Sequence, residues 1–172
     1  MTDSGTASTD ADDLDTIARA IGLVVLQWGQ AEQSLDLLVA VLWQSFDGKR
    51  FAKRIPVMLE PKIHFVRACL PRQPDLTLHA EAAERLLLEF ERLSGLRHDL
   101  IHGAVASLAP VNRAFVFARL EVRDGFHHHK EVHVSVDAYP QIIDQLVALG
   151  AAAHQLVAEV FEVAKDLGPI VK

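Results

Sequence analysis

Residues 96–103 gather polar, chemically versatile side chains where the pattern predicts the C-terminal end of a long helix. Six consecutive residues contain an arginine, two histidines and an aspartate, namely Arg97, His98, Asp99 and His102. A histidine can accept and donate a proton near neutral pH, and the arginine guanidinium presents a fixed fork of donors to a phosphate or a carboxylate. These residue types favour acid–base chemistry on an anionic substrate over the packing of a helix end against a core.

The spacing limits how these side chains can meet. On a regular helix, Arg97 and His102 lie about 140° apart around the axis, whereas His98 and His102 share one face, one turn apart. Convergence of Arg97 and His102 therefore needs a tightened last turn or a second chain related by a two-fold axis. The negative end of the helix dipole also favours the protonated form of a histidine in the last turn, which suits acid–base work.

The arrangement resembles a known motif. An arginine, a polar residue directly after it and a histidine five positions on are similar to the Arg-x4-6-His motif of the HEPN superfamily, many of whose members are metal-independent ribonucleases. His98 matches the family preference for Asn, Asp or His after the arginine. The resemblance implies a compact helical bundle and a homodimer whose two motifs line one cleft. It also implies RNA cleavage that leaves a 2',3'-cyclic phosphate, as in a toxin or defence component.

Roles follow from that chemistry. Cleavage needs one group to take the proton of the ribose 2'-hydroxyl, another to protonate the leaving 5'-oxygen, and positive charge on the phosphorane. His102 fits either proton transfer, and Arg97 fits the third task. No metal ion or other cofactor is expected.

Glu32 is the candidate contributed by the first helix. In the superfamily a polar residue of that helix commonly lies beside the motif, and Glu32 falls in an apolar row with Val25 and Val39. A buried carboxylate needs a partner, and we expect Arg97 to provide it. A glutamate at the edge of the stripe, reaching solvent, is the open alternative. The catalytic candidates are thus Arg97, His102, His98, Glu32 and Asp99.

The charge distribution locates a candidate RNA-binding segment. The net charge is −6, which argues against nucleic acid, but five aspartates lie within residues 1–15 without any basic residue. Between Lys49 and Arg72, seven basic residues stand against Glu60 alone, a local excess of +6. This segment is a candidate phosphate-attracting patch, and a solvated helix face is the equal alternative. The substrate-binding candidates are Lys49, Arg50, Lys53 and Arg54.

Composition fits a globular protein. The chain has 172 residues, is 50% hydrophobic and has a mean hydropathy of +0.17, enough for one domain with its own core. No apolar run reaches the roughly 18 to 20 residues that a membrane span needs. The one cysteine, Cys69, has apolar neighbours that suggest a buried, inert thiol. We expect a cytoplasmic protein without membrane contact.

Apolar periodicity predicts a mainly α fold, an up-and-down bundle of three long helices plus a short helix, with a small antiparallel β-hairpin inserted before the last helix. Residues 1–11 are expected to form a disordered acidic tail, and 12–172 a single HEPN-like domain with the hairpin at about 104–136. The expected helices are one from Asp12 or Asp13 to about Phe46, stopped by Asp47-Gly48; a short one from about Pro61 to Leu70; one from Asp75 or Thr77 to a left-handed Gly103; and one from a capping Asp137 to Gly168-Pro169.

The hairpin register is open between two pairings, and a third strand is conceivable at 104–108. A two-residue loop at Asp124-Gly125 places Val116 opposite His133, and a three-residue loop places it opposite Val134. We prefer the second, because it gives a cleaner apolar face.

The hairpin also carries metal-type side chains. His127, His129, Glu131 and His133 share one face of a strand, but ligands in a row do not converge on a tetrahedral site. A solvated hairpin is the favoured interpretation.

A function of another class uses the same face. In that alternative the chain is a catalytically silent HEPN-like helical dimer that binds a partner protein, such as a cognate antitoxin, or a nucleotide. Arg97, His98, Asp99 and Glu32 would then be a buried polar network that fixes helix register.

Overall fold

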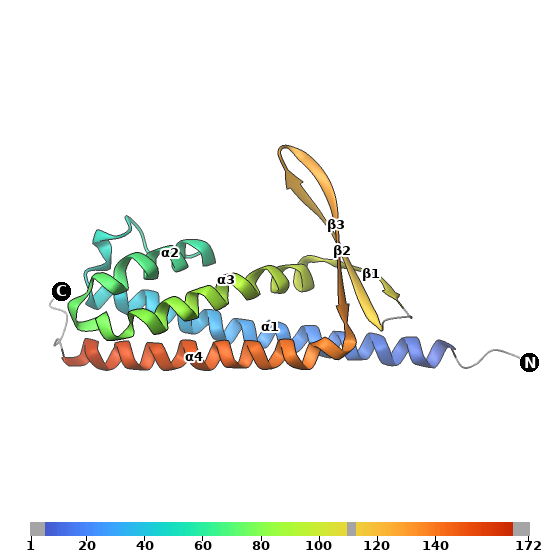
Figure 1. Ribbon diagram of the computed structural model, residues 1–172, viewed down its shortest axis with the longest axis horizontal. Helices are drawn as coiled ribbons and strands as arrows, with labels where there is room; N and C mark the ends of the chain where they lie inside the picture. The colour runs from blue at the N-terminus through green and yellow to red at the C-terminus, as the bar shows by residue number, and fades with distance from the viewer. Residues whose placement is uncertain (1–5, 110–112, 167–172) are drawn as a thin grey trace, which may run out of the picture. The chain divides into compact units, whose positions relative to one another are not determined.

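The computed structural model describes residues 6–109 and 113–166, and its fold is mainly α-helical, as predicted. A three-stranded antiparallel sheet of order β1-β2-β3 follows the third helix along the chain and precedes the fourth (Figure 1). The third strand, left open by the sequence, is present. The helices are α1 (Thr6–Ser45), α2 (Leu59–Cys69), α3 (Ala80–His102) and α4 (Tyr139–Asp166), and the strands are β1 (Ala104–Ala109), β2 (Ala114–Arg123) and β3 (Phe126–Ser135).

The chain divides into two compact units. The first comprises Met1–Gln27 with Ser94–Gln145, and so holds the beginning of α1, the end of α3, the whole sheet and the start of α4. The second comprises Trp28–Leu93 with Leu146–Lys172, and holds α2 with the rest of the long helices. That residues 12–172 form a single domain stays a prediction.

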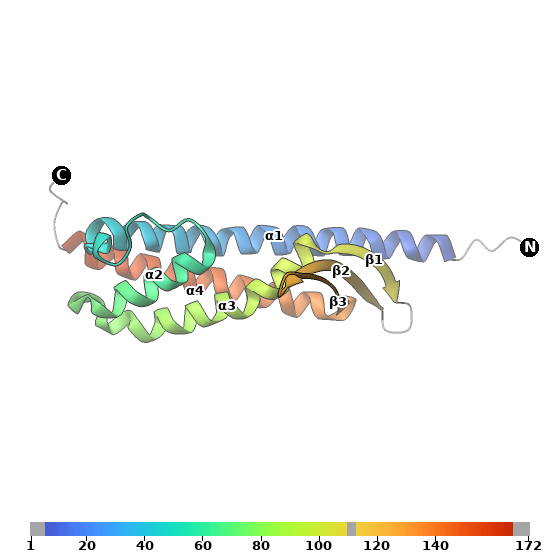
Figure 2. The same cartoon turned by 90° about the horizontal axis from the view of Figure 1, so that it is seen from above.

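The second unit is built on interlocking helical stripes. The edge of the Trp28 ring meets Phe90, with ring centroids 5.7 Å apart, and a Cβ on Gly150 would lie 4.0 Å from the Ala31 nitrogen, a close approach of α4 to α1. Helix α2 runs beside α3 in both views (Figures 1 and 2). The buried stripes are Ala31, Leu35, Leu38 and Leu42 of α1; Leu86, Leu87, Phe90 and Leu93 of α3; and Leu146, Leu149, Ala153, Leu156 and Val160 of α4.

The two ends of α1 differ in how well the sequence predicted them. The helix begins at Thr6, several residues before the expected start at Asp12 or Asp13. It therefore includes part of the expected tail, whose residues 1–5 lie outside the described residues. The stop at Asp47-Gly48 is confirmed, and Asp47 is the left-handed residue, with φ 52°.

The end of α3 needs a glycine for a reason other than the predicted one. Gly103 does not adopt the left-handed conformation, which among the described glycines belongs to Gly125. A Cβ on Gly103 would instead lie 2.5 Å from the Asp99 carbonyl oxygen and 2.9 Å from Phe117 Cβ. The predicted left-handed cap is wrong, and the glycine permits close contact between the helix end and β2.

The hairpin register contradicts our preferred pairing. Val116 lies opposite His133, so the loop is the two-residue Asp124-Gly125 and not the three-residue form. Both loop residues have positive φ, 52° and 80°, as in a type I′ turn, whose twist matches that of the flanking strands. The preference of Asp-Gly for a two-residue turn therefore sets the strand register, and the apolar match of Val116 with Val134 does not.

The start of α4 also differs from the prediction. Asp137 is not the cap, because it lies within the short 3-10 turn η5 (Val136–Ala138), and Ser135 Oγ accepts the hydrogen bond from the Asp137 nitrogen. The predicted stop at Gly168-Pro169 lies outside the described residues. Within 6–109 and 113–166, the stretch Val136–Asp166 is the one helix long and apolar enough to cross a membrane. A core helix of a soluble protein meets the same criteria, so this feature assigns no membrane.

We predict that Gly103→Ala lowers the free energy of unfolding by about 1–3 kcal/mol, because the new methyl group has no space and its neighbours must shift. Gly22→Ala is the matched control. Gly22 lies on α1, where an added Cβ would meet nothing within 4 Å, so alanine there should stabilise by about 0.5–1 kcal/mol. Urea denaturation measures the free energy of unfolding of both variants. Equal changes in the two variants would contradict the close contact of Gly103 with Asp99 and Phe117.

Candidate functional site

The two histidines of the motif meet at the end of α3. The His98 and His102 ring centroids lie 4.7 Å apart with the planes inclined by 53°, and both residues are exposed. The expectation that they share one helical face is confirmed. Arg97 begins the same stretch and is half-buried. The exposed end of α3 thus carries two adjacent imidazoles next to a guanidinium-bearing residue.

Asp99 is held by the sheet and is not a free acid. The residue is 6% exposed, with Oδ1 2.8 Å from Arg119 Nε of β2 and Oδ2 2.8 Å from Lys130 Nζ of β3. Glu121 completes the group, because it pairs with Arg119 and lies 3.5 Å from Lys130 Nζ. Two cations and two carboxylates therefore join the helix end to the sheet, and Asp99 is best placed to position its neighbours.

Three residues of this group were not predicted from the sequence, namely Arg119, Glu121 and Lys130. Arg119 lies directly opposite Lys130 in the β2–β3 ladder, so both project from the same face of the sheet as Phe117. The usable signal was the alternation along β2, where charged residues continue a row of buried aromatic residues. The partner of Arg119 depends in addition on the register, and the preferred three-residue loop places Glu131 opposite it in place of Lys130.

The ion group and the burial of the ring act on His98. Burial is the largest cause that lowers its pKa below the ordinary value of 6.5, and the positive charges of Arg119 and His102 lower it further. The carboxylate of Asp99 opposes the shift. The helix-end argument, which favours a protonated histidine, is wrong for His98. A neutral imidazole at neutral pH can accept a proton.

Glu32 lies in the second unit, where it has partners of its own. Its carboxylate accepts a hydrogen bond from Trp28 Nε1 at 2.9 Å and one from Lys62 Nζ at 3.3 Å. Lys62, 3% exposed, also pairs with Asp36 at 2.6 Å. Glu32 therefore helps to neutralise a buried lysine. A pair between Glu32 and Arg97 would join the two units and stays a prediction.

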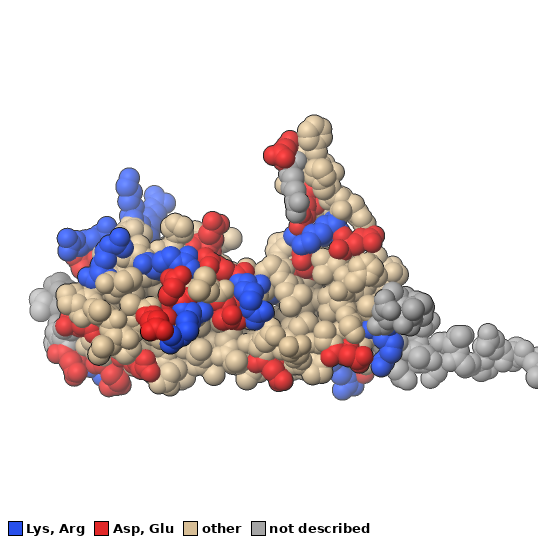
Figure 3. Space-filling model, in the orientation of Figure 1, with Lys and Arg blue, Asp and Glu red and all other residues tan. Residues whose placement is uncertain are grey.

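The basic segment is only partly available to a ligand. Lys62 is buried in the ion pairs just described, and Arg67 binds both Glu84 and Glu91. The cations engaged in this way, Lys62 and Arg67, both belong to α2. The four substrate-binding candidates precede α2, and all four are exposed. Lys and Arg side chains gather over η1 (Gly48–Arg50) and the loop that follows it (Figure 3). The exposed cations are Lys49, Arg50, Lys53 and Arg54.

The hairpin histidines are spread along one exposed face. Glu131 lies 3.7 Å from His129 Nδ1 and 3.8 Å from His133 Nε2, and His127 is further along the strand. No cluster of three or more His, Cys, Asp or Glu residues suited to a metal ion occurs in the part of the chain that the structure describes.

Cys69 fits the predicted inert thiol. It is fully buried, and burial raises the pKa of the thiol, which opposes ionisation.

The chain matches no protein-family model, no curated protein and no solved structure. The resemblance of residues 97–102 to the HEPN motif accordingly stays a prediction.

We predict that Asp99→Asn lowers the free energy of unfolding by about 2 kcal/mol. Breaking a fully buried ion pair costs about 3–5 kcal/mol, and Arg119 and Lys130 are partly exposed, which reduces that cost. Asp15→Asn breaks an exposed pair with Arg19 and should change stability by less than about 1 kcal/mol. Denaturant titration of both variants provides the comparison, and similar values would remove the central role of Asp99.

We predict that the NMR titration midpoint of His98 lies below 6.5 and that Arg119→Gln raises it, because the substitution removes a positive charge that lowers the pKa. The unfolded chain binds a proton on His98 at a higher pH than the folded chain does. The contribution of this residue to stability is therefore lost as the pH falls below 6.5. A His98 midpoint at or above 6.5, or one that Arg119→Gln leaves unchanged, would contradict the stated cause.

Proposed function

We propose that the chain is a metal-independent endoribonuclease of the HEPN type, with its reacting groups at the end of α3. The observation that carries the proposal is the pair of exposed, adjacent imidazoles of His98 and His102, with Arg97 preceding His98 in the same helical turn. Two histidines in contact supply one proton acceptor and one proton donor, which is the minimum that RNA cleavage through the ribose 2'-hydroxyl requires.

The reaction assigns one task to each group. A neutral imidazole takes the proton of the 2'-hydroxyl, whose oxygen forms a bond to phosphorus. The bond from phosphorus to the 5'-oxygen breaks, and the second imidazole, protonated beforehand, gives its proton to that oxygen. The products are a 2',3'-cyclic phosphate and a 5'-hydroxyl.

The lowered pKa of His98 suits the proton acceptor, which leaves the donor role to His102. Arg97 supplies the fixed donors for the charge that develops on the phosphorane. Asp99, Arg119 and Lys130 act as positioning residues, because they fix the helix end on the sheet without reaching substrate.

RNA binding is proposed for the exposed cations of the loop after α1. Lys49, Arg50, Lys53 and Arg54 are followed by no acidic residue before Glu60, so they attract phosphates. Such contacts weaken steeply as salt increases. The negative net charge of the chain does not oppose this, because most of it lies before residue 16.

A homodimer belongs to the proposal, since it would bring two copies of the motif to one cleft. What supports it is exposed apolar surface on the first unit's part of α1. Leu14, Val25 and Leu26 are exposed there, and a Cβ on Gly22 would meet nothing within 4 Å. Leu14 and Val25, eleven residues apart, lie on one side of the helix, which suits packing against a second helix.

One observation favours a second function. Both oxygens of Asp99 are engaged by the sheet, so part of the polar segment has a structural purpose. A catalytically silent binding module needs no more than this. Only an activity measurement separates the two functions.

The decisive experiment incubates labelled single-stranded RNA with the purified protein in excess EDTA. The unaltered chain should produce fragments ending in a cyclic phosphate, identified by mass spectrometry. His102→Ala and His98→Ala should each lower the rate by about 10²–10⁴-fold, because each removes one proton transfer. Arg97→Lys keeps the charge but loses the fork of donors, and should also slow cleavage.

The matched control is His154→Ala, which removes an exposed histidine from α4. It should leave the rate unchanged, and circular dichroism should give one melting temperature for all four variants. Undiminished cleavage by His102→Ala would overturn the proposal, and metal-dependent products would do the same.

A further inference from the structure

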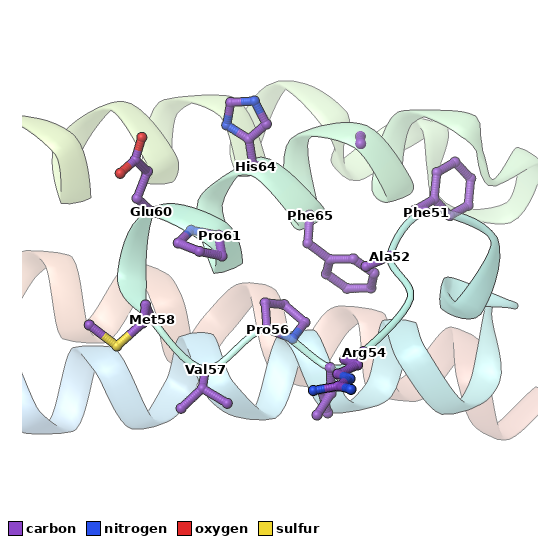
Figure 4. Close-up of a pocket in the computed structure, with 12 residues that line it drawn as sticks. Phe51, Ala52, Arg54, Pro56, Val57, Met58, Glu60, Pro61, His64 and Phe65 are labelled. Atoms are coloured by element: carbon purple, nitrogen blue, oxygen red, sulfur yellow. The ribbon is translucent and has the colours of Figure 1, made fainter.

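A groove lies between α2 and the loop that leads into it, entirely within the second unit. Its cavity measures about 670 Å³ and is lined mainly by apolar side chains. Pro61 and Phe65 of α2 point toward the loop, whose Pro56 closes the other side (Figure 4). Proline fixes its own backbone φ, so the two prolines limit collapse of the space. Such a volume accommodates one or two large side chains of a ligand.

The loop also exposes consecutive apolar residues at this groove. Val57 is 73% exposed, Met58 is 71% exposed and Ile55 is 44% exposed. An isolated exposed aliphatic residue is ordinary, but three that border a concave apolar space form a contiguous patch. Their burial by a ligand would be favourable.

The charge around the groove is strongly one-sided. Four exposed cations precede the patch, and Arg54 itself lines the cavity. Glu60, at the start of α2, is the one carboxylate among the lining residues. A bound ligand is therefore favoured electrostatically if it carries negative charge near Arg54 and no negative charge near Glu60. The surface is complementary to a segment that is acidic and apolar at once.

The aromatic rings are not available as platforms for a nucleobase. Phe65 is 3% exposed and packs on Trp43, with ring centroids 5.9 Å apart. The Phe51 ring has the Arg72 guanidinium over it at 6.0 Å. Unpaired bases bind chiefly by stacking on free aromatic faces, which these contacts occupy. A lipid surface would cover Val57 and Met58 but could not fill the cavity.

We infer that this groove binds an acidic, amphipathic peptide segment of a partner protein. Aliphatic side chains of the segment enter the cavity against Pro61 and Phe65, and its carboxylates pair with Lys53 and Arg54. Met58 is unbranched and flexible, which suits a surface that adapts to a peptide. The site is a helix-in-groove or extended-peptide site, and no catalytic role is attached to it.

The inference does not depend on the proposed ribonuclease activity. If both hold, a bound acidic peptide covers Lys53 and Arg54 and competes with RNA for them. An acidic segment would then limit RNA binding without contacting His98 or His102. Loss of activity in the histidine variants and loss of peptide binding in groove variants are separate measurements.

The test selects peptides of about 16 residues, roughly four helical turns, from a random phage-displayed library on the full chain. The selected peptides should be enriched in Asp and Glu next to Leu, Ile or Met. Measured by fluorescence anisotropy, the double variant Val57→Ser/Met58→Ser should bind them about tenfold more weakly, because apolar burial is lost. The double variant Lys53→Glu/Arg54→Glu should also bind weakly, and added salt should weaken binding to the unaltered chain.

Two matched controls keep the result specific. Leu78→Ser replaces an aliphatic residue that is 93% exposed but lies outside the groove, and Arg85→Glu reverses an exposed cation on α3. Both should bind as the unaltered chain does, and all variants should share its melting temperature.

The inference is overturned if selection enriches no peptides, if the enriched peptides lack acidic residues, or if the groove variants bind them unchanged. It is also overturned if single-stranded RNA or anionic phosphatidylserine vesicles bind in a way that requires Val57 and Met58 while acidic peptides do not compete.

Discussion

The salt bridges of Asp99 fix the end of α3 on the sheet, and the candidate site depends on them. A carboxylate on a residue that is 6% exposed would be costly without partners, and Arg119 and Lys130 each approach one of its oxygens at 2.8 Å. Because His98 precedes Asp99 directly, the orientation of the last turn fixes the imidazole too. The same interaction sets the local field, since Arg119 is among the groups that lower the pKa of His98. Structure and reactivity are thus coupled through one aspartate.

The second unit also contains a buried charge that needs partners, but here the charge is positive. Lys62 is a buried cation between Glu32 and Asp36, and Trp28 donates a further hydrogen bond to Glu32. This arrangement engages two residues to which the sequence gave other roles, the buried Lys62 of the basic segment and the partly exposed Glu32 of the catalytic candidates. The segment before α2 keeps exposed cations, of which Arg50 lies 3.5 Å from Asp47, and no acidic residue follows them before Glu60. Exposed cations are concentrated in this loop because the charges of Lys62 and Arg67 on α2 are paired with carboxylates of α1 and α3.

The sequence predicted the parts of this structure that depend on local periodicity. Helix type, the stop at Asp47-Gly48 and the shared face of His98 and His102 follow from spacing alone. Predictions failed where distant residues decide. The space at Gly103 is limited by Phe117, and the fate of Asp99 depends on two residues of the sheet. The apolar match of Val116 misled because residues 114–117 are buried on both faces, so burial there does not choose between the two pairings, and the two-residue turn at Asp124-Gly125 does.

The two-residue turn at Asp124-Gly125 determines which charges surround Asp99. In the observed register Lys130 stands opposite Arg119, so two cations balance two carboxylates. A loop longer by one residue would place Glu131 opposite Arg119 and send Lys130 to the other face. Arg119 would then face three carboxylates, those of Asp99, Glu121 and Glu131, with no second cation. Repulsion among these carboxylates would destabilise the alternative register, and with it the contact between the sheet and the end of α3.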